Sequence, residues 1–212
     1  MLRLAVSARH EGAALSASVL RQGPNGGSSH RQARPGGLHD RTECLYAPGM
    51  SDLTADFYRQ NEWASLQLIG VCRGLSDEQL GATAVGTYGS IRATLRHLVS
   101  SEANYAFRLG EGPIRRLPPD EPWPGFDVLA EMVSVNAAVF GAAARGDANR
   151  IIRLDPDTDP YDSEAAVVLV QAFNHATEHR SQICTILTTL GIEPPDMSGW
   201  EWGLADGRMR KV

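Results

Sequence analysis

The chain has 212 residues, with 20 basic and 25 acidic side chains and a net charge of −5 at pH 7. This length suits one domain, or one domain with an appendage. No uninterrupted apolar run approaches the ~18 residues of a spanning helix, so we expect no membrane-spanning segment. The three cysteines, at positions 44, 72 and 184, are too few and too scattered for a disulfide framework, which favours a cytoplasmic location.

Residues 1–49 differ in composition from the remainder. They hold six Arg and three acids, a net charge of +3, and subtraction from the totals leaves −8 for residues 50–212. Their Gly-, Pro- and Ser-rich clusters show no apolar periodicity and cannot bury enough surface to offset the entropy of ordering. We interpret residues 1–49 as a flexible extension or as sequence upstream of the natural start, with an Arg-rich transit peptide as an alternative. The folded domain should cover 50–212, and its negative charge argues against nucleic acid as a partner.

The folded part is predicted to form four helices. Apolar residues recur at helical spacing in four stretches, at about 53–75, 90–110, 127–145 and 163–191. Ser90 and Ser163 are suitable N-caps, and Gly110 and Gly191 are suitable residues for helix ends. No segment reads as a convincing strand. The sequence therefore predicts an all-α four-helix bundle with long connections at about 110–126 and 146–162.

Three histidines in the folded part are spaced like metal ligands. His175 and His179 are four residues apart on one helix, so both rings lie on the same face and can bind one metal ion. His97, in the middle of the second helix, can reach the same point from a facing helix. Three neutral imidazoles leave a coordination position open, as in catalytic sites. The alternative is three unrelated histidines, and His10, His30 and His39 lie in the extension.

Polar side chains on the same helix faces are candidates to orient ligands or to contact substrate. Ser101, Asn104 and Arg108 align with His97, and the residues that align with His175 are Gln171, Glu178 and Gln182. The alternative is a solvated rim. Buried asparagines need hydrogen-bond partners, which an imidazole can supply; Asn61 and Asn136 lie on apolar stripes and are candidates for this role. Glu102, also on an apolar stripe, is expected to be a paired buried or interfacial acid and not a metal ligand.

Several segments together resemble the DinB/YfiT-like superfamily. They are the run Asn61-Glu62-Trp63, the run from His97 to Glu102, the run from Asn174 to Ile183, and the aromatic tail from Gly199 to Gly203. The resemblance covers about 50–205. It implies a four-helix bundle, often dimeric, in which three histidines hold a divalent metal. The positions that match those histidines are His97, His175 and His179.

Characterised members of the superfamily include S-transferases that use mycothiol, bacillithiol or glutathione, and a maleylpyruvate isomerase. The resemblance therefore implies a metal-dependent transferase that adds a low-molecular-weight thiol to an electrophilic small molecule. The alternative is a non-catalytic metal-binding module for stress response or interaction. Three imidazoles suit zinc, nickel, iron and copper; zinc or nickel is the metal that we expect, with iron or copper as alternatives. Because imidazole must be neutral to bind a metal, affinity is expected to fall below about pH 6.5.

Two further expectations concern the cysteines and the oligomer. Cys184 is rotated about 180° from His175 on the same helix, and Cys72 has the neighbours of a core residue, so we expect neither to be the nucleophile. Any reacting thiol should then come from a small cosubstrate. The run of Val167, Val168, Leu169 and Val170 makes the fourth helix apolar nearly all round, which together with the resemblance predicts a homodimer.

Overall fold

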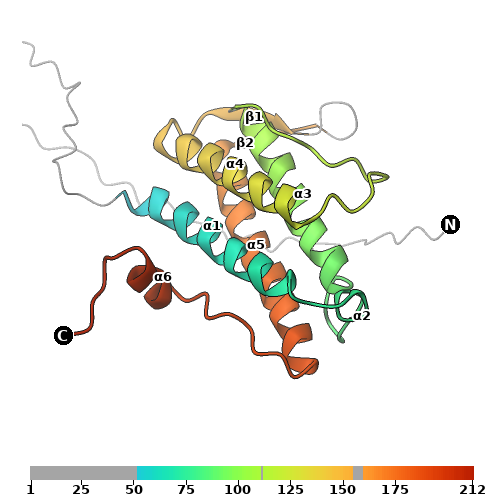
Figure 1. Ribbon diagram of the computed structural model, residues 1–212. Helices are drawn as coiled ribbons and strands as arrows, with labels where there is room; N and C mark the ends of the chain where they lie inside the picture. Colours follow the sequence, from blue (N-terminus) through green and yellow to red (C-terminus); the bar gives the residue numbers. More distant parts are fainter. Residues whose placement is uncertain (1–51, 111, 155–159) are drawn as a thin grey trace, which may run out of the picture. The chain divides into compact units, whose positions relative to one another are not determined.

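The computed structural model describes residues 52–110, 112–154 and 160–212. The N-terminal extension over 1–49 lies outside the described residues. Six helices and two strands form within that part of the chain: α1 (Leu53–Cys72), α2 (Asp77–Leu80), α3 (Ile91–Leu109), α4 (Phe126–Arg145), β1 (Ile151–Leu154), β2 (Tyr161–Glu164), α5 (Ala165–Thr189) and α6 (Gly199–Ala205). The four long helices form a bundle, which confirms the predicted all-α class (Figure 1).

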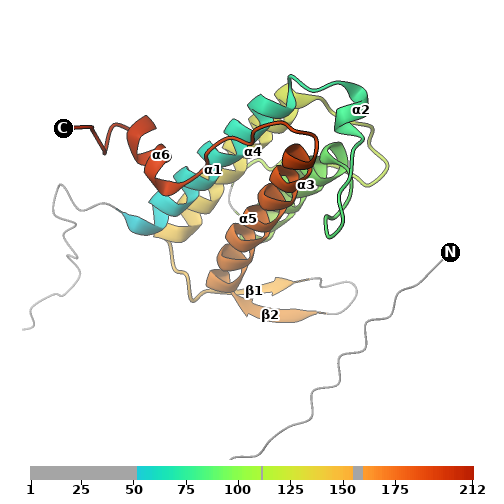
Figure 2. The same cartoon turned by 90° about the horizontal axis from the view of Figure 1, so that it is seen from below.

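Each long helix of the bundle has two main neighbours. Helix α1 packs on α4 and α5, and α3 packs on the same two helices. Figure 2 shows α3 and α5 side by side along one flank of the bundle. These two helices run in opposite directions, so the C-terminal half of α3 faces the N-terminal half of α5 (Figure 1). All three candidate metal ligands lie on this pair.

The core consists of two apolar clusters. One is built around Leu68, Leu98, Leu129 and Ile183, and the other around Phe140 and its neighbours near strands β1 and β2. Full burial of each of these large side chains contributes about 1.5–3 kcal/mol. Between the clusters, each long helix contributes buried polar side chains, which are Asn61, Ser65, Glu102, Asn136 and Arg180. We refer to these five residues as the polar layer.

The predicted helix boundaries agree with the structure except at two places. Ser90 caps α3 by accepting from the backbone N–H of Ala93 at 3.2 Å, and Gly110 ends the helix with a φ of 73°. Helix α1 ends at Cys72, three residues before the predicted end, and Ser76 then starts the short helix α2 with a capping box. The second difference, at the start of α5, involves a hairpin.

The expectation of no strand over 146–162 was wrong. Strands β1 and β2 pair antiparallel, with Ile151 opposite Glu164 and Leu154 opposite Tyr161. Ser163 therefore lies in β2, and α5 begins two residues later without a side-chain cap. Ile152 and Leu154 pack against the core cluster near the hairpin, and this burial outweighs the cap that Ser163 could supply. Two alternating residues are too short a pattern to identify a strand from sequence.

Helix α4 is apolar because one of its faces packs in the core. Among the described residues it is the one helix with the length and composition of a membrane span, and half of its apolar stretch is buried in the bundle. Leu129, Met132 and Phe140 are on that buried face, toward α1 and α3. The bundle accounts for the apolar character of α4, as it does for any core helix.

Candidate metal centre

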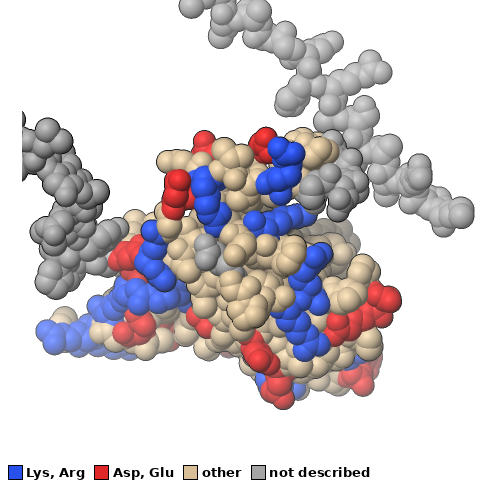
Figure 3. Space-filling view, turned by 90° about the horizontal axis from the view of Figure 1, so that it is seen from above, with Lys and Arg blue, Asp and Glu red and all other residues tan. Residues whose placement is uncertain are grey.

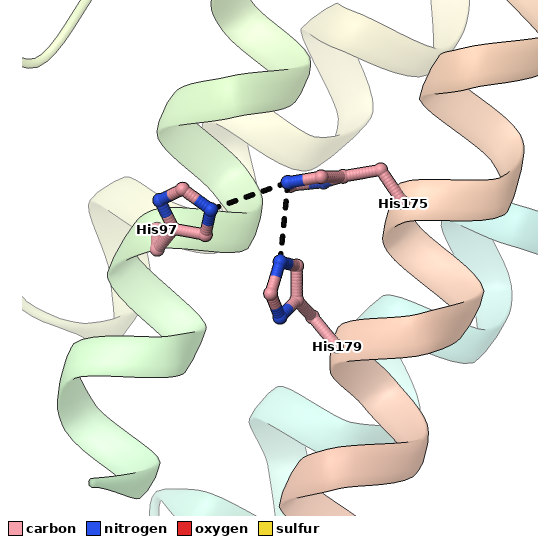
Figure 4. A group of neighbouring side chains, drawn as sticks. All are labelled: His97, His175 and His179. Carbon is pink, nitrogen blue, oxygen red and sulfur yellow. Dashed lines mark hydrogen bonds between the residues drawn. The ribbon is translucent and has the colours of Figure 1, made fainter. Parts of the chain in front are cut away.

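The side chains of His97, His175 and His179 converge between α3 and α5 (Figure 4). The Nε2 atom of His175 lies 3.2 Å from Nε2 of His97 and 3.1 Å from Nε2 of His179. One potential ligand atom from each ring lies within 4.8 Å of the others. The sequence prediction that these three histidines meet is confirmed.

These spacings fit a metal ion. Two nitrogens that bind one zinc ion tetrahedrally at 2.0–2.1 Å lie about 3.3 Å apart. The two Nε2–Nε2 distances, 3.2 and 3.1 Å, are close to that value. Two ligands come from one helix and the third from its neighbour, so an ion bound here would join α3 to α5. The donor set of three imidazole nitrogens matches the preferences of zinc, nickel, iron and copper.

The environment keeps two of the imidazoles neutral at pH 7. Burial lowers the pKa of His175 to about 4, and the neighbouring rings of His179 and His97 lower it further in the same direction. Burial, and then the nearby ring of His179, also lowers the pKa of His97. A neutral imidazole retains the lone pair that a metal needs, so these rings are ready to bind an ion without first losing a proton.

Gln182 and Glu178 hold one side of the centre. The Oε1 atom of Gln182 lies 2.9 Å from Nδ1 of His179. Its Nε2 group donates to Oε1 of Glu178 at 3.4 Å. Hydrogen bonds of this kind orient a histidine ligand and select its tautomer. Gln182 therefore lies beside His179, as its place on the helix predicted, and an orienting role for it stays a prediction.

Two tyrosines line the centre. The ring of Tyr88 stacks on His97 with centroids 4.1 Å apart, and it meets the ring of His179 edge-on at 5.4 Å. On the other side, the ring of Tyr105 meets His175 edge-on at 5.6 Å. Gln171 donates to the Tyr105 hydroxyl at 3.4 Å. Sequence reasoning missed Tyr88, because a residue of the 81–90 loop has no helical periodicity that could place it near the histidines.

The remaining candidate residues are Asn104, Arg108 and Asn61. Asn104 accepts a hydrogen bond from Nε of Arg116 at 2.9 Å. Arg108 lies in the last turn of α3. Asn61 lies inside the bundle, where it donates to Oε1 of Glu102 at 2.8 Å and accepts from Nη1 of Arg180 at 2.7 Å. Its partners are therefore members of the polar layer.

Glu102 is a buried, hydrogen-bonded acid, as the sequence suggested. Its side chain is buried completely, and this burial raises its pKa to about 7 against the opposing effects of Asn61 and Arg180. Arg180, which sequence reasoning did not single out, also donates to Ser65 at 3.0 Å and to Thr177 at 3.2 Å. Because Arg180 follows His179 directly, this turn of α5 contributes to both the metal centre and the polar layer.

Neither described cysteine is activated. Burial raises the pKa of the Cys72 thiol to about 12. Burial also raises the pKa of Cys184, against the smaller opposing effect of Arg180. Both groups therefore remain protonated thiols near pH 7, and a protonated thiol is a poor nucleophile.

Comparisons with known proteins support the fold and identify a family. The model of the DinB family matches residues 50–203. Among solved structures, the chain is similar to a DinB-like protein from Bacillus cereus ATCC 10987, with a TM-score of 0.51 and 16% sequence identity. That match covers 66% of this chain and 92% of the other, and at such identity it supports the fold alone. The comparison with curated proteins gave no match.

Proposed function

This chain belongs to the DinB family, and on that basis we propose that it is a divalent-metal-dependent enzyme. The reaction that we propose is the transfer of a low-molecular-weight thiol to an electrophilic small molecule. The observation that carries the proposal is the convergence of three imidazole Nε2 atoms, at 3.2 and 3.1 Å, on one flank of the bundle. Zinc or nickel is the metal that we expect, since both suit three nitrogen ligands.

A divalent ion held by the three imidazoles would supply Lewis-acid chemistry, which lowers the pKa of a thiol or water that binds beside them. His97 and His175 offer neutral rings at pH 7, and Gln182 orients His179. The flanking rings of Tyr88 and Tyr105 provide apolar surfaces next to the centre. Ligand sites commonly combine such aromatic walls with a few polar groups.

The thiol in the proposed reaction comes from a separate small molecule. Cys72 is buried, with a pKa of about 12, and burial also raises the pKa of Cys184. Neither side chain therefore supplies a thiolate at neutral pH. The two free thiols suit the reducing cytoplasm, where we propose that the reaction takes place and where low-molecular-weight thiols are kept reduced.

A small-molecule substrate also agrees with the charge of the domain. Residues 50–212 carry a net charge of −8, whereas nucleic-acid binding needs a basic surface. On the face drawn in Figure 3, basic side chains are interspersed with acidic ones. Ion pairs such as Arg73–Asp127 and Arg115–Glu121 neutralise part of the positive charge.

The test is an activity screen with defined metals and thiols. The metal-free chain is loaded with zinc, nickel, iron or copper and is mixed with mycothiol, bacillithiol or glutathione and one generic aryl halide. We expect thioether formation that requires the metal and is lost in His175→Ala. His30→Ala, in the extension, is the matched control and should retain activity. Tight metal binding without turnover with any of the thiols would favour the alternative, a non-catalytic metal-binding module.

A further inference from the structure

We propose that Gln182 and Tyr88 act as one positioning unit for the three histidines. A single oxygen atom, Oε1 of Gln182, accepts from the backbone N–H of Tyr88 at 3.1 Å and lies 2.9 Å from Nδ1 of His179. The side chain of Tyr88 then lies on His97. This inference rests on the proposed metal function and adds to it a loop residue that holds two ligands in place.

The orientation of the Gln182 amide is determined by its partners. The backbone N–H of Tyr88 can only donate, so the atom facing it must be the amide oxygen. The carboxylate of Glu178 accepts, so the atom facing it is the amide nitrogen. Both contacts give the same orientation. Because an amide oxygen cannot donate, Nδ1 of His179 must carry the hydrogen, and its Nε2 atom keeps the lone pair that points toward the other histidines.

The Tyr88 ring is placed by these contacts and not by core burial. Tyr88 is 56% exposed, so the hydrophobic effect alone would not fix the position of its ring. The Tyr88 ring lies nearly parallel to the His97 ring, at an angle of 14°. A stacked ring restricts rotation of the imidazole and so keeps Nε2 of His97 directed at Nε2 of His175. The loop itself is tightened by Thr87, whose hydroxyl donates to the carbonyl of Ala84 at 2.8 Å.

A shared oxygen couples the two effects. Without the Gln182 oxygen, His179 would no longer be held in one tautomer. The backbone N–H of Tyr88 would lose its acceptor as well, so the ring that covers His97 would be free to move. Removal of Gln182 and removal of the Tyr88 ring should therefore not have independent effects on metal binding. His175 lacks a comparable restraint, since its Nδ1 atom is buried and has no hydrogen-bond partner among the described residues.

The first experiment measures zinc affinity of the full chain by chelator competition. We expect Gln182→Ala to weaken binding by about 10–100-fold. The double variant Gln182→Glu/Glu178→Gln keeps an acceptor oxygen and the total charge, and it should restore affinity to within about tenfold of the unchanged chain. Tyr88→Phe keeps the stacked ring and should bind like the unchanged chain, whereas Tyr88→Ala should weaken binding. Combining Tyr88→Ala with Gln182→Ala should weaken it by less than the product of the two single effects.

The second experiment measures amide hydrogen exchange at Tyr88. Zinc loading should slow this exchange in the unchanged chain, because the ion fixes His179 and hence Gln182, and it should not do so in Gln182→Ala. Suppose that the unchanged chain binds zinc. If the losses of zinc affinity in the two single variants then multiply fully, or if amide hydrogen exchange at Tyr88 is the same with and without zinc, the positioning unit is refuted but the metal centre is not. If the unchanged chain binds no divalent ion, the proposed function fails together with this inference.

Discussion

Replacement of Asn61 by alanine should destabilise the bundle strongly, because this side chain joins two buried charged groups. Asn61 is 3% exposed. Its Nδ2 group donates to Glu102 at 2.8 Å, and its Oδ1 atom accepts from Arg180 at 2.7 Å. Alanine removes both bonds at once. Arg180 keeps Ser65 and Thr177 as partners, whereas the side chain of Glu102 has no other hydrogen bond in the described part of the chain.

The expected cost follows from these contacts. A hydrogen bond to a charged group is worth about 1.5–3 kcal/mol, and removal of the partner of a buried charge costs about 3–5 kcal/mol. Protonation limits the penalty here, because burial already raises the pKa of Glu102 to about 7. We therefore expect a loss of about 3 kcal/mol at pH 7. For a domain of this size that corresponds to a fall in Tm of roughly 6–12 °C.

Asn136 provides a matched control for this substitution. It is also a buried asparagine of the polar layer, 1% exposed, but the one hydrogen bond described for its side chain is a long one of 3.4 Å to the carbonyl of Val99. Asn136→Ala should therefore cost only about 1 kcal/mol. Urea unfolding of the chelator-treated proteins, followed by circular dichroism, measures both. Equal losses for the two variants would show that the contacts of Asn61 with Glu102 and Arg180 do not carry the stability assigned to them.

Four further predictions can be checked by separate measurements. Burial raises the pKa of Glu102 from 4.5 to about 7. Its contribution to the stability of the metal-free chain is therefore complete below pH 4.5 and is lost as pH rises through 7. Urea unfolding at a series of pH values should show this loss in the unchanged chain and not in Glu102→Gln. Calorimetry should show a loss of metal affinity by orders of magnitude in each of the variants His97→Ala, His175→Ala and His179→Ala. In the unchanged chain, metal affinity should persist to lower pH than an ordinary imidazole allows, because the pKa values of His97 and His175 are lowered. Removal of residues 1–49 should change neither Tm nor metal content. Light scattering should report a homodimer, and Val170→Asp should dissociate it. Val167 and Val170 are 57% and 60% exposed, and Val170 lines an apolar hollow between α1 and α5.

The sequence was sufficient to predict the elements that repeat a pattern. Helical spacing of apolar residues identified all four long helices, and the interval of four residues between His175 and His179 placed both rings on one face. The contribution of His97 could be anticipated because a bundle brings facing helices within reach of one ion. The helices and the histidine pair needed only the periodicity of single helices, whereas the contribution of His97 also needed the fold class.

Contacts that depend on tertiary structure could not be predicted in this way. Tyr88 reaches His97 because the loop after α2 folds back along the bundle, and no local pattern encodes that path. The hairpin of β1 and β2 forms because Ile152 and Leu154 find a place on the core, which no window of a few residues reveals. The partners of Asn61 lie 41 and 119 positions away in the chain, so the sequence indicated only that it needed partners.

The position of the metal centre beside the polar layer has a structural consequence. His179 and Arg180 are consecutive, so their side chains leave α5 in different directions, His179 toward the other histidines and Arg180 toward Asn61 and Ser65. This turn of the helix is therefore restrained from two sides. An apolar side chain at position 180 would allow this turn of α5 to slide against the neighbouring helices. Directional hydrogen bonds instead fix the position of the turn along the bundle axis. Arg180 of α5 donates to Asn61 of α1, and Asn61 in turn donates to Glu102 of α3. Since a metal site tolerates only small errors in ligand position, the polar layer contributes to the centre by linking α5 to α3 at the register in which the three imidazoles meet.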